Sequence, residues 1–143
     1  MIVVDASLAA KWILWEVDTP AALGFLRAHA KRLAAPDLAF VEVAGAIVRR
    51  GNMDKTLKGE ALLSLRRWSA TWASQAVKAY PVTESRLLGA SSLALQLGTP
   101  LKDCLYLQLA MELECDLATC DVRFRDKAAG LYPGVKLLSE YAP

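Results

Sequence analysis

Short apolar runs alternate with longer stretches of helical periodicity along the whole chain. Strands that alternate with helices build mostly parallel sheets. The pattern therefore predicts the α/β class, with a central, mostly parallel sheet of about five short strands flanked by helices. The predicted strands span residues 2–5, 32–35, 79–82, 117–120 and 135–138.

Capping, proline and glycine signals predict where the helices begin and end. Ser7 is expected to cap the first helix, which would carry Trp12 and Trp15 at helical spacing. Gly51-Asn52 is expected to end the helix that begins at Leu38. The other predicted helices span residues 19–30, 54–72, 83–98, 102–114 and 123–129. No repeat or linker interrupts the pattern, so residues 1–143 are expected to form one domain.

Composition narrows the possible chemistry. The chain is 55% hydrophobic and 22% charged, and no uncharged apolar run approaches the roughly 18 residues that a membrane span needs. We therefore expect a soluble cytoplasmic protein without membrane association or a secretory signal. The single histidine, His29, leaves few ways to assemble a Ser-His-Asp or Cys-His site, and the three cysteines have no paired C-x-x-C spacing. An enzyme of this composition is expected to use carboxylates.

Four acidic residues lie beside apolar segments. Asp5 and Asp121 follow predicted strands, Asp103 is in the first turn of a predicted helix, and Glu42 interrupts the apolar stretch 38–44. Ligand sites of parallel α/β sheets lie beyond the carboxyl ends of the strands, so these carboxylates can converge if the two strands are neighbours. Clustered carboxylates are typical ligands of hard divalent cations.

Three of the four acids also have a structural explanation. Asp5 and Asp121 can cap the helices that follow them, and Asp103 can interact with a helix dipole. Glu42 has no capping role, because it shares a predicted helix face with Leu38, Val41 and Gly45 that would point toward the sheet. The coincidence of all four favours a shared site.

The chain resembles PIN-domain ribonucleases, specifically the VapC-type toxins of toxin–antitoxin pairs. The resemblance lies in four segments that occur in family order and span nearly the whole chain: residues 2–7, 35–43, 103–110 and 119–124. It implies a single PIN-like domain with catalytic, metal-binding carboxylates at Asp5, Glu42, Asp103 and Asp121. Ser7 and Thr119 are expected to support this site. Cys104 and Cys120 depart from the family pattern, in which a small alanine is expected.

The resemblance also implies an activity and partners. We expect an endoribonuclease that uses Mg²⁺ or Mn²⁺ and leaves 5′-phosphate and 3′-hydroxyl ends, because these hard ions prefer oxygen ligands. A cognate antitoxin and a homodimer are expected partners. With the four acids set aside, 17 basic residues face 11 acidic ones, a balance that suits RNA. Arg123 and Arg125 are candidate contacts to phosphates, and a solvated helical face is the simpler reading of both.

The sequence is also compatible with three other functions. A receiver-like signalling domain that binds Mg²⁺ would share the size and the fold class, but it needs a second acid beside Asp5, where Ala6-Ser7 stands. A degenerate PIN domain could bind nucleic acid without cutting it. A nuclease that acts on DNA is the third alternative.

Overall fold

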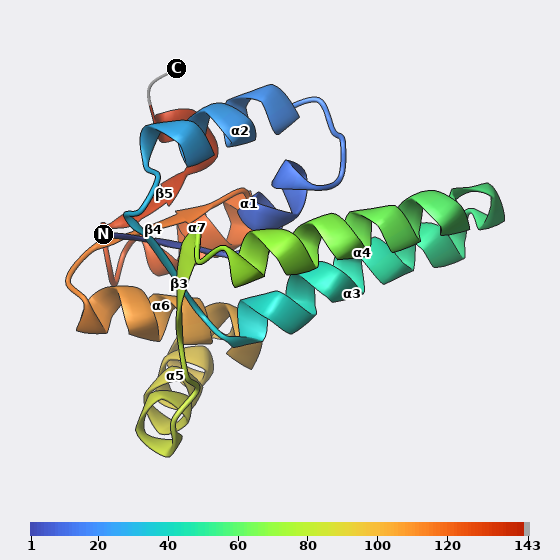
Figure 1. The fold of residues 1–143 in the computed structure, drawn as a ribbon. Helices are drawn as coiled ribbons and strands as arrows, with labels where there is room; N and C mark the ends of the chain where they lie inside the picture. The colour runs from blue at the N-terminus through green and yellow to red at the C-terminus, as the bar shows by residue number, and fades with distance from the viewer. Residues whose placement is uncertain (142–143) are drawn as a thin grey trace.

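The computed structural model describes residues 1–141, which form one five-stranded sheet surrounded by helices (Figure 1). All strands pair in parallel, in the order β3-β2-β1-β4-β5. The strands are β1 Ile2–Val4, β2 Leu33–Pro36, β3 Val77–Tyr80, β4 Asp116–Thr119 and β5 Val135–Leu137. The predicted α/β class is confirmed, and the third strand lies slightly earlier than residues 79–82.

Seven α-helices and three 3₁₀ helices connect the strands within the described residues. The α-helices are α1 Ala6–Ala9, α2 Thr19–Ala28, α3 Leu38–Met53, α4 Lys58–Ala73, α5 Glu84–Leu97, α6 Leu101–Glu112 and α7 Val122–Ala128. The 3₁₀ helices are η1 Ala10–Trp12, η2 Lys55–Leu57 and η3 Leu138–Glu140. Among residues 1–141, no helix is both long and apolar enough to cross a membrane.

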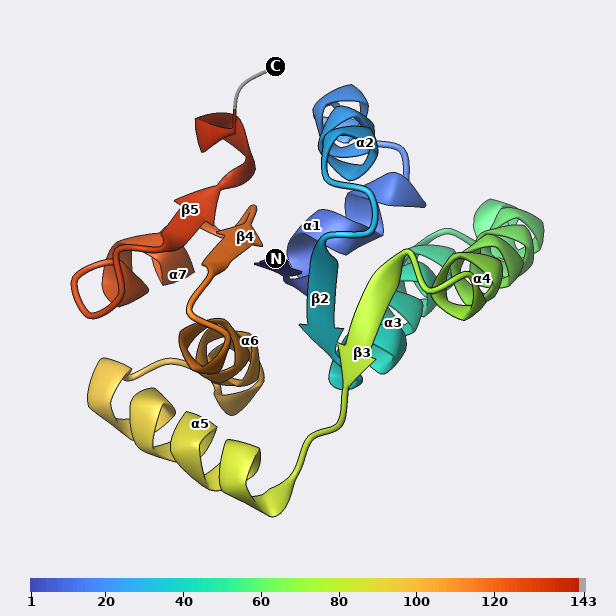
Figure 2. The same cartoon turned by 60° about the vertical axis from the view of Figure 1, so that its left-hand side comes forward.

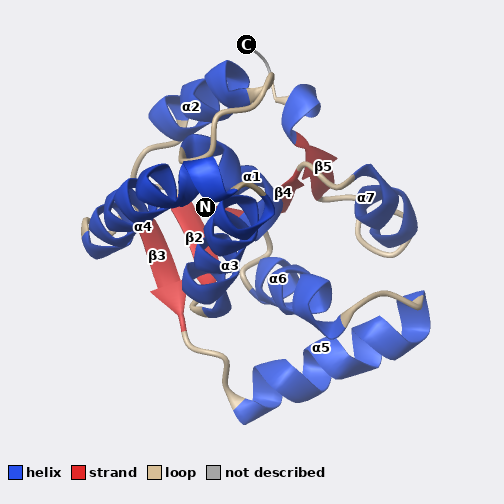
Figure 3. Cartoon of the chain, turned by 90° about the vertical axis from the view of Figure 1, so that its right-hand side faces the viewer, coloured by secondary structure: helices blue, strands red, loops and turns tan. Residues whose placement is uncertain are grey.

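The core is centred on β1, β2 and β4. Every residue of β1 and β2 is buried, as expected for parallel strands that are covered on both faces. Helix α6 packs against β1, β2 and β4, and α5 covers its outer side (Figures 2 and 3). Helices α3 and α4 pack together as a long hairpin that projects from the sheet (Figure 1). From the carboxyl end of β1 the chain enters α1, and from that of β4 it passes through two residues into α7.

Two predicted helix boundaries are wrong. Helix α3 continues through Gly51 to Met53, because Gly51 is buried against α4, where a Cβ at this position would lie 3.0 Å from the Ala61 Cβ. This glycine permits close helix packing and does not end the helix. The first helix is capped by Asp5, with Ser7 inside it, and regular α-helix ends at Ala9. Trp15 lies beyond it and is 71% exposed.

Candidate active site

The pairing of β1 with β4 brings two predicted acids to one edge of the sheet. Val4 is in register with Ala118, and the Asp5 amide donates a hydrogen bond to the Ala118 carbonyl at 3.2 Å. Asp5 directly follows β1, and Asp121 lies two residues after Thr119, the last residue of β4. The two segments are far apart in sequence, and their strands are direct neighbours.

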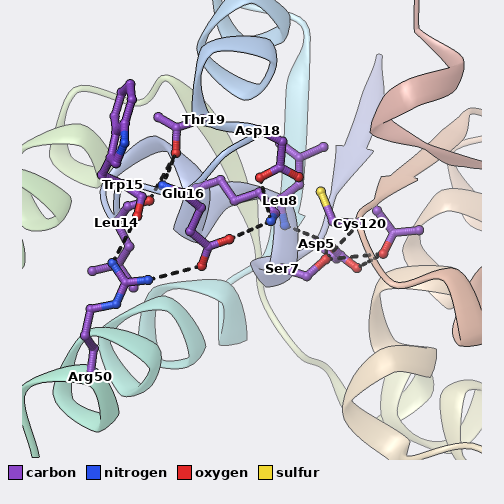
Figure 4. A network of polar contacts seen from close by, with 12 residues as sticks. Asp5, Ser7, Leu8, Leu14, Trp15, Glu16, Asp18, Thr19, Arg50 and Cys120 are labelled. Carbon is purple, nitrogen blue, oxygen red and sulfur yellow. Dashed lines mark hydrogen bonds and ion pairs between the residues drawn. The ribbon is translucent and has the colours of Figure 1, made fainter. Parts of the chain in front are cut away.

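The Asp5 carboxylate is held by hydrogen bonds on both oxygens (Figure 4). Oδ1 accepts from the Ser7 hydroxyl at 2.6 Å and from the Leu8 amide at 3.1 Å. The Thr119 hydroxyl donates to Oδ2. Ser7 and Thr119 thus both contact Asp5, and they fix the direction in which this carboxylate points.

The same two hydroxyls connect Asp5 to the loop after β4. Ser7 Oγ accepts a hydrogen bond from the Cys120 amide at 3.0 Å, and Thr119 Oγ1 accepts one from the Asp121 amide at 3.0 Å. Asp121 then caps α7, with Oδ1 accepting from the Phe124 amide at 3.0 Å. The loop that carries Asp121 is therefore tied to the segment after β1 through the side chains of Ser7, in α1, and Thr119, in β4.

Burial and like charge make the site unfavourable for negative charge. The pKa of Asp5 is raised to about 6, mainly by burial. Hydrogen bonds from Ser7, Thr119 and Leu8 lower this pKa, and the charge of Asp103 raises it. Burial also raises the pKa of Asp103, which the charges of Asp121 and Glu42 raise as well, while Lys102 lowers it. Asp103 is therefore within electrostatic range of Asp5, Asp121 and Glu42.

Glu42 reaches the site from α3. The hydroxyl of Tyr106, on α6, donates a hydrogen bond to Glu42 Oε1 at 2.7 Å, and Lys102 Nζ lies 3.7 Å from Oε2. The buried face of α3 consists of Ala39, Val43, Ile47 and Gly51. The predicted face was therefore wrong in part, since Val41 is 66% exposed, and Glu42 lies at the flank of the buried face with a side chain that is 17% exposed.

Asp103 and Asp121 line a cleft of about 260 Å³ whose walls also carry two basic residues, Arg123 and Lys127. Lys127 Nζ donates to the Gly98 carbonyl at 3.2 Å, and Arg123 is exposed. Arg125 does not line this cleft, because it is paired with Asp126 at 3.0 Å and with Glu140 at 3.4 Å. Of the two candidate RNA contacts, only Arg123 stands beside the acids.

The four predicted carboxylates do not form a finished coordination shell within the described residues. Within residues 1–141, no three His, Cys, Asp or Glu side chains stand close enough together to be a ready-made metal site. Asp5, Glu42 and Asp121 instead accept hydrogen bonds from neighbouring groups, and Asp103 lines the cleft. The donor set nevertheless fits Mg²⁺ or Mn²⁺, because it consists of carboxylate oxygens. A bound cation would also stabilise the charged forms of Asp5 and Asp103, which burial disfavours.

Tyr106 and Lys102 were not predicted as site residues. Both contact Glu42 across the gap between α3 and α6, a tertiary contact that a local pattern does not reveal. Helical spacing could have indicated Tyr106, because it lies three residues after Asp103 and therefore on the same side of α6. Burial, together with the charges of Glu42, Asp5 and Asp103, raises the pKa of Tyr106, so its hydroxyl remains a hydrogen-bond donor.

A second, larger groove lies away from the acids. It has a volume of about 540 Å³ and is bounded by α3, α4 and the segment after η1, with a mostly apolar lining that includes Ile13, Leu14, Trp15 and Arg50. Trp12 and Trp68 are buried and Trp72 packs against the core, whereas Trp15 is exposed in this groove. Three of the four tryptophans thus contribute to the core, and Trp15 is left accessible.

The strand order distinguishes this domain from receiver-like domains. Receiver domains have the order 2-1-3-4-5, and this sheet has the order 3-2-1-4-5. With acidic residues at the carboxyl ends of its parallel strands, the chain is an α/β domain with a candidate site for a hard cation. The chain belongs to the PIN-domain family: the family model for the PIN domain matches residues 2–130. PIN domains are a family of nucleases that are generally metal-dependent.

Solved structures share the fold across nearly the whole chain. A toxin–antitoxin complex from Klebsiella pneumoniae matches with a TM-score of 0.70 at 16% identity, covering 99% of this chain and 100% of the other. PAE2754 from Pyrobaculum aerophilum matches with a TM-score of 0.72 at 17% identity, covering 96% and 90%. The sarcin–ricin-loop-cleaving toxin VapC20 from Mycobacterium tuberculosis matches with a TM-score of 0.75 at 14% identity, covering 95% and 99%. A comparison with curated protein sequences found no match.

Proposed function

We propose that this protein is a Mg²⁺- or Mn²⁺-dependent endoribonuclease that acts as the toxin of a toxin–antitoxin pair. The observation that carries the proposal is the pairing of β1 with β4 in a PIN-domain sheet, which brings the segments of Asp5 and Asp121 to one edge, where Asp103 and Asp121 line a cleft. These four residues would hold the cation. When bound, the ion supplies an activated water and neutralises charge on the phosphate.

The protein's own residues have distinct parts in this scheme. Ser7 and Thr119 orient Asp5, and the Thr119 hydroxyl also holds the Asp121 amide. Arg123 and Lys127 stand in the cleft beside Asp103 and Asp121, where they can bind RNA phosphates next to the cutting point. The acids would repel a polyanion by themselves, so basic residues at the rim favour approach of the backbone.

The cutting activity can be tested with purified protein and a panel of structured and single-stranded RNAs. We expect internal cuts that leave 5′-phosphate ends, that require Mg²⁺ or Mn²⁺ and that stop with EDTA. Asp121→Asn is expected to abolish cutting, while Asp126→Asn, an exposed acid on the next helix, serves as the matched control. Binding of RNA without cutting would instead identify a degenerate PIN domain, and cutting of DNA alone would contradict the ribonuclease proposal.

We assign the apolar groove beside the α3–α4 hairpin to the antitoxin. The support is its mostly apolar lining, the exposed arginine Arg66 at its wall and the exposed indole of Trp15, which suit an amphipathic helix with acidic residues. The structural likeness to a chain of a toxin–antitoxin complex agrees with such a partner. Identification of a small reading frame next to this gene, followed by co-purification of its product, tests the assignment.

A homodimer is part of the same proposal. Leu88 and Leu95 on α5 are 62% and 86% exposed, which leaves apolar surface on a helix whose other side packs on α6. Light scattering on the purified toxin should give twice the mass of the 15.5 kDa chain. A monomeric mass over the full concentration range would contradict the dimer.

A further inference from the structure

Glu42 and Tyr106 form a hydrogen-bonded pair between two helices, α3 and α6. Glu42 lies on α3 and Tyr106 on α6, 64 positions apart in sequence, with 2.7 Å between the Tyr106 hydroxyl and Glu42 Oε1. The tyrosine is 2% exposed, so its hydroxyl has no access to bulk water. Removal of the hydroxyl would leave this oxygen of a largely enclosed carboxylate without a protein donor.

The two oxygens of Glu42 have unequal partners. Oε1 accepts from the buried tyrosine hydroxyl, while Oε2 lies 3.7 Å from the ammonium of Lys102, whose side chain is 59% exposed. An exposed ion pair at this distance contributes little and is easily exchanged. The tyrosine is therefore the fixed partner, and Lys102 is the replaceable one.

Tyr106, the partner of Glu42, is close in sequence to another of the acids on α6. Tyr106 lies one helical turn after Asp103, so its ring and the Asp103 side chain are on the same side of α6. Glu42 acts electrostatically on Asp103, which places its charge near that turn. A glutamate side chain has three rotatable bonds, and its ordering costs free energy unless a partner has already limited its rotamers.

We propose that Tyr106 is a positioning residue that holds Glu42 in the orientation from which it binds the divalent cation. The hydroxyl holds Oε1, and Oε2, whose partner is the exposed Lys102, would be available as a cation ligand. Partners of this kind orient metal ligands, and their loss typically weakens metal binding by about 10–100-fold. The inference rests on the proposed function, since it takes Glu42 to be a metal ligand.

The alternative is that the hydroxyl merely satisfies a buried tyrosine, as buried tyrosines usually require. Tyr132 supplies a matched control for that role. Its hydroxyl donates to the carbonyls of Cys115, at 2.7 Å, and Ala110, at 3.3 Å, at the other end of α6. Both Tyr106→Phe and Tyr132→Phe remove one hydroxyl from a tyrosine whose ring packs in the structure, and only the first touches a carboxylate of the site.

The experiment is a calorimetric titration of EDTA-stripped protein with Mn²⁺, together with thermal unfolding of each variant. We expect Tyr106→Phe to weaken Mn²⁺ binding by about 10-fold and Tyr132→Phe to leave it unchanged. In a Glu42→Gln background, where binding is already weaker, Tyr106→Phe is expected to have no further effect on the affinity. This double-mutant cycle separates an action through Glu42 from a general loss of packing.

The outcomes distinguish this inference from the proposed function. Equal Mn²⁺ affinity of the wild type and Tyr106→Phe would overturn the role of Tyr106 and leave the metal site standing. A 10-fold loss that persists in the Glu42→Gln background would also overturn it, because the tyrosine would then act without Glu42. A wild-type protein that binds no Mn²⁺ would overturn the metal site and this inference together.

Discussion

Replacement of Asp5 by asparagine should stabilise the metal-free protein at neutral pH. The pKa of Asp5 is raised from an ordinary value of 3.8 to about 6, chiefly by burial. The folded state therefore binds the proton more tightly than the unfolded chain does. The stability contributed by this group is full below pH 3.8 and is lost as the pH rises through about 6. An asparagine is neutral throughout and keeps that stability at neutral pH.

The expected gain follows from the size of the shift. A pKa that is raised by about two units corresponds to about 3 kcal/mol of free energy. The amide cannot accept hydrogen bonds on its nitrogen, so part of the bonding to Ser7, Leu8 and Thr119 is lost, at a cost of about 1 kcal/mol. We therefore expect Asp5→Asn to raise the free energy of unfolding by about 2 kcal/mol near pH 7.5 in EDTA.

Urea denaturation near pH 7.5 and near pH 4 measures this effect. The gain should shrink toward zero at the lower pH, because the folded wild type then carries a neutral Asp5 as well. Asp54→Asn is the matched control: Asp54 is fully exposed, and hydrogen bonds from Thr56 lower its pKa, so this variant should show no gain at neutral pH. Equal destabilisation by Asp5→Asn at both pH values would refute the reasoning.

Three further predictions concern the rim, the groove and the support of Asp5. Arg123→Ala should weaken RNA binding in filter assays and reduce its salt dependence by about one unit of slope, whereas Arg125→Ala, whose side chain is paired with Asp126 and Glu140, should not. Trp68→Ala should lower stability to urea by about 3–5 kcal/mol, because the indole is buried, while the exposed Trp15→Ala should keep stability and weaken antitoxin binding. Thr119→Val should slow RNA cutting by about 10-fold, and Thr119→Ser, which retains the hydroxyl, should restore it.

Much of the fold was predictable because its signals are local. The apolar runs that became β1 and β4 are short and end beside aspartates, and Thr83 and Gly98 bound α5 as cap signals predict. The predicted end of α3 at Gly51 was wrong because a glycine can either end a helix or allow close helix packing. Only the tertiary contact with Ala61 decides between the two.

The site was predictable only where position along the chain fixes position in space. Asp5 and Asp121 follow strands that pair, so the edge of the sheet brings their segments together. The orientation of Glu42 depends on Tyr106, a contact between distant helices, and periodicity misassigned its face. The sequence pattern also carries no information on how closely the carboxylates approach one another, since that depends on their hydrogen-bond partners.

The most direct measurement of the central claim is a crystal structure with Mn²⁺, recorded at a wavelength where manganese scatters anomalously. We expect an anomalous peak with oxygen ligands from the group Asp5, Glu42, Asp103 and Asp121, at the carboxyl ends of β1 and β4. The same peak should be absent from crystals of the Asp121→Asn variant. A wild-type structure in which Mn²⁺ binds elsewhere, or not at all, would contradict the metal-dependent site on which the proposed function rests.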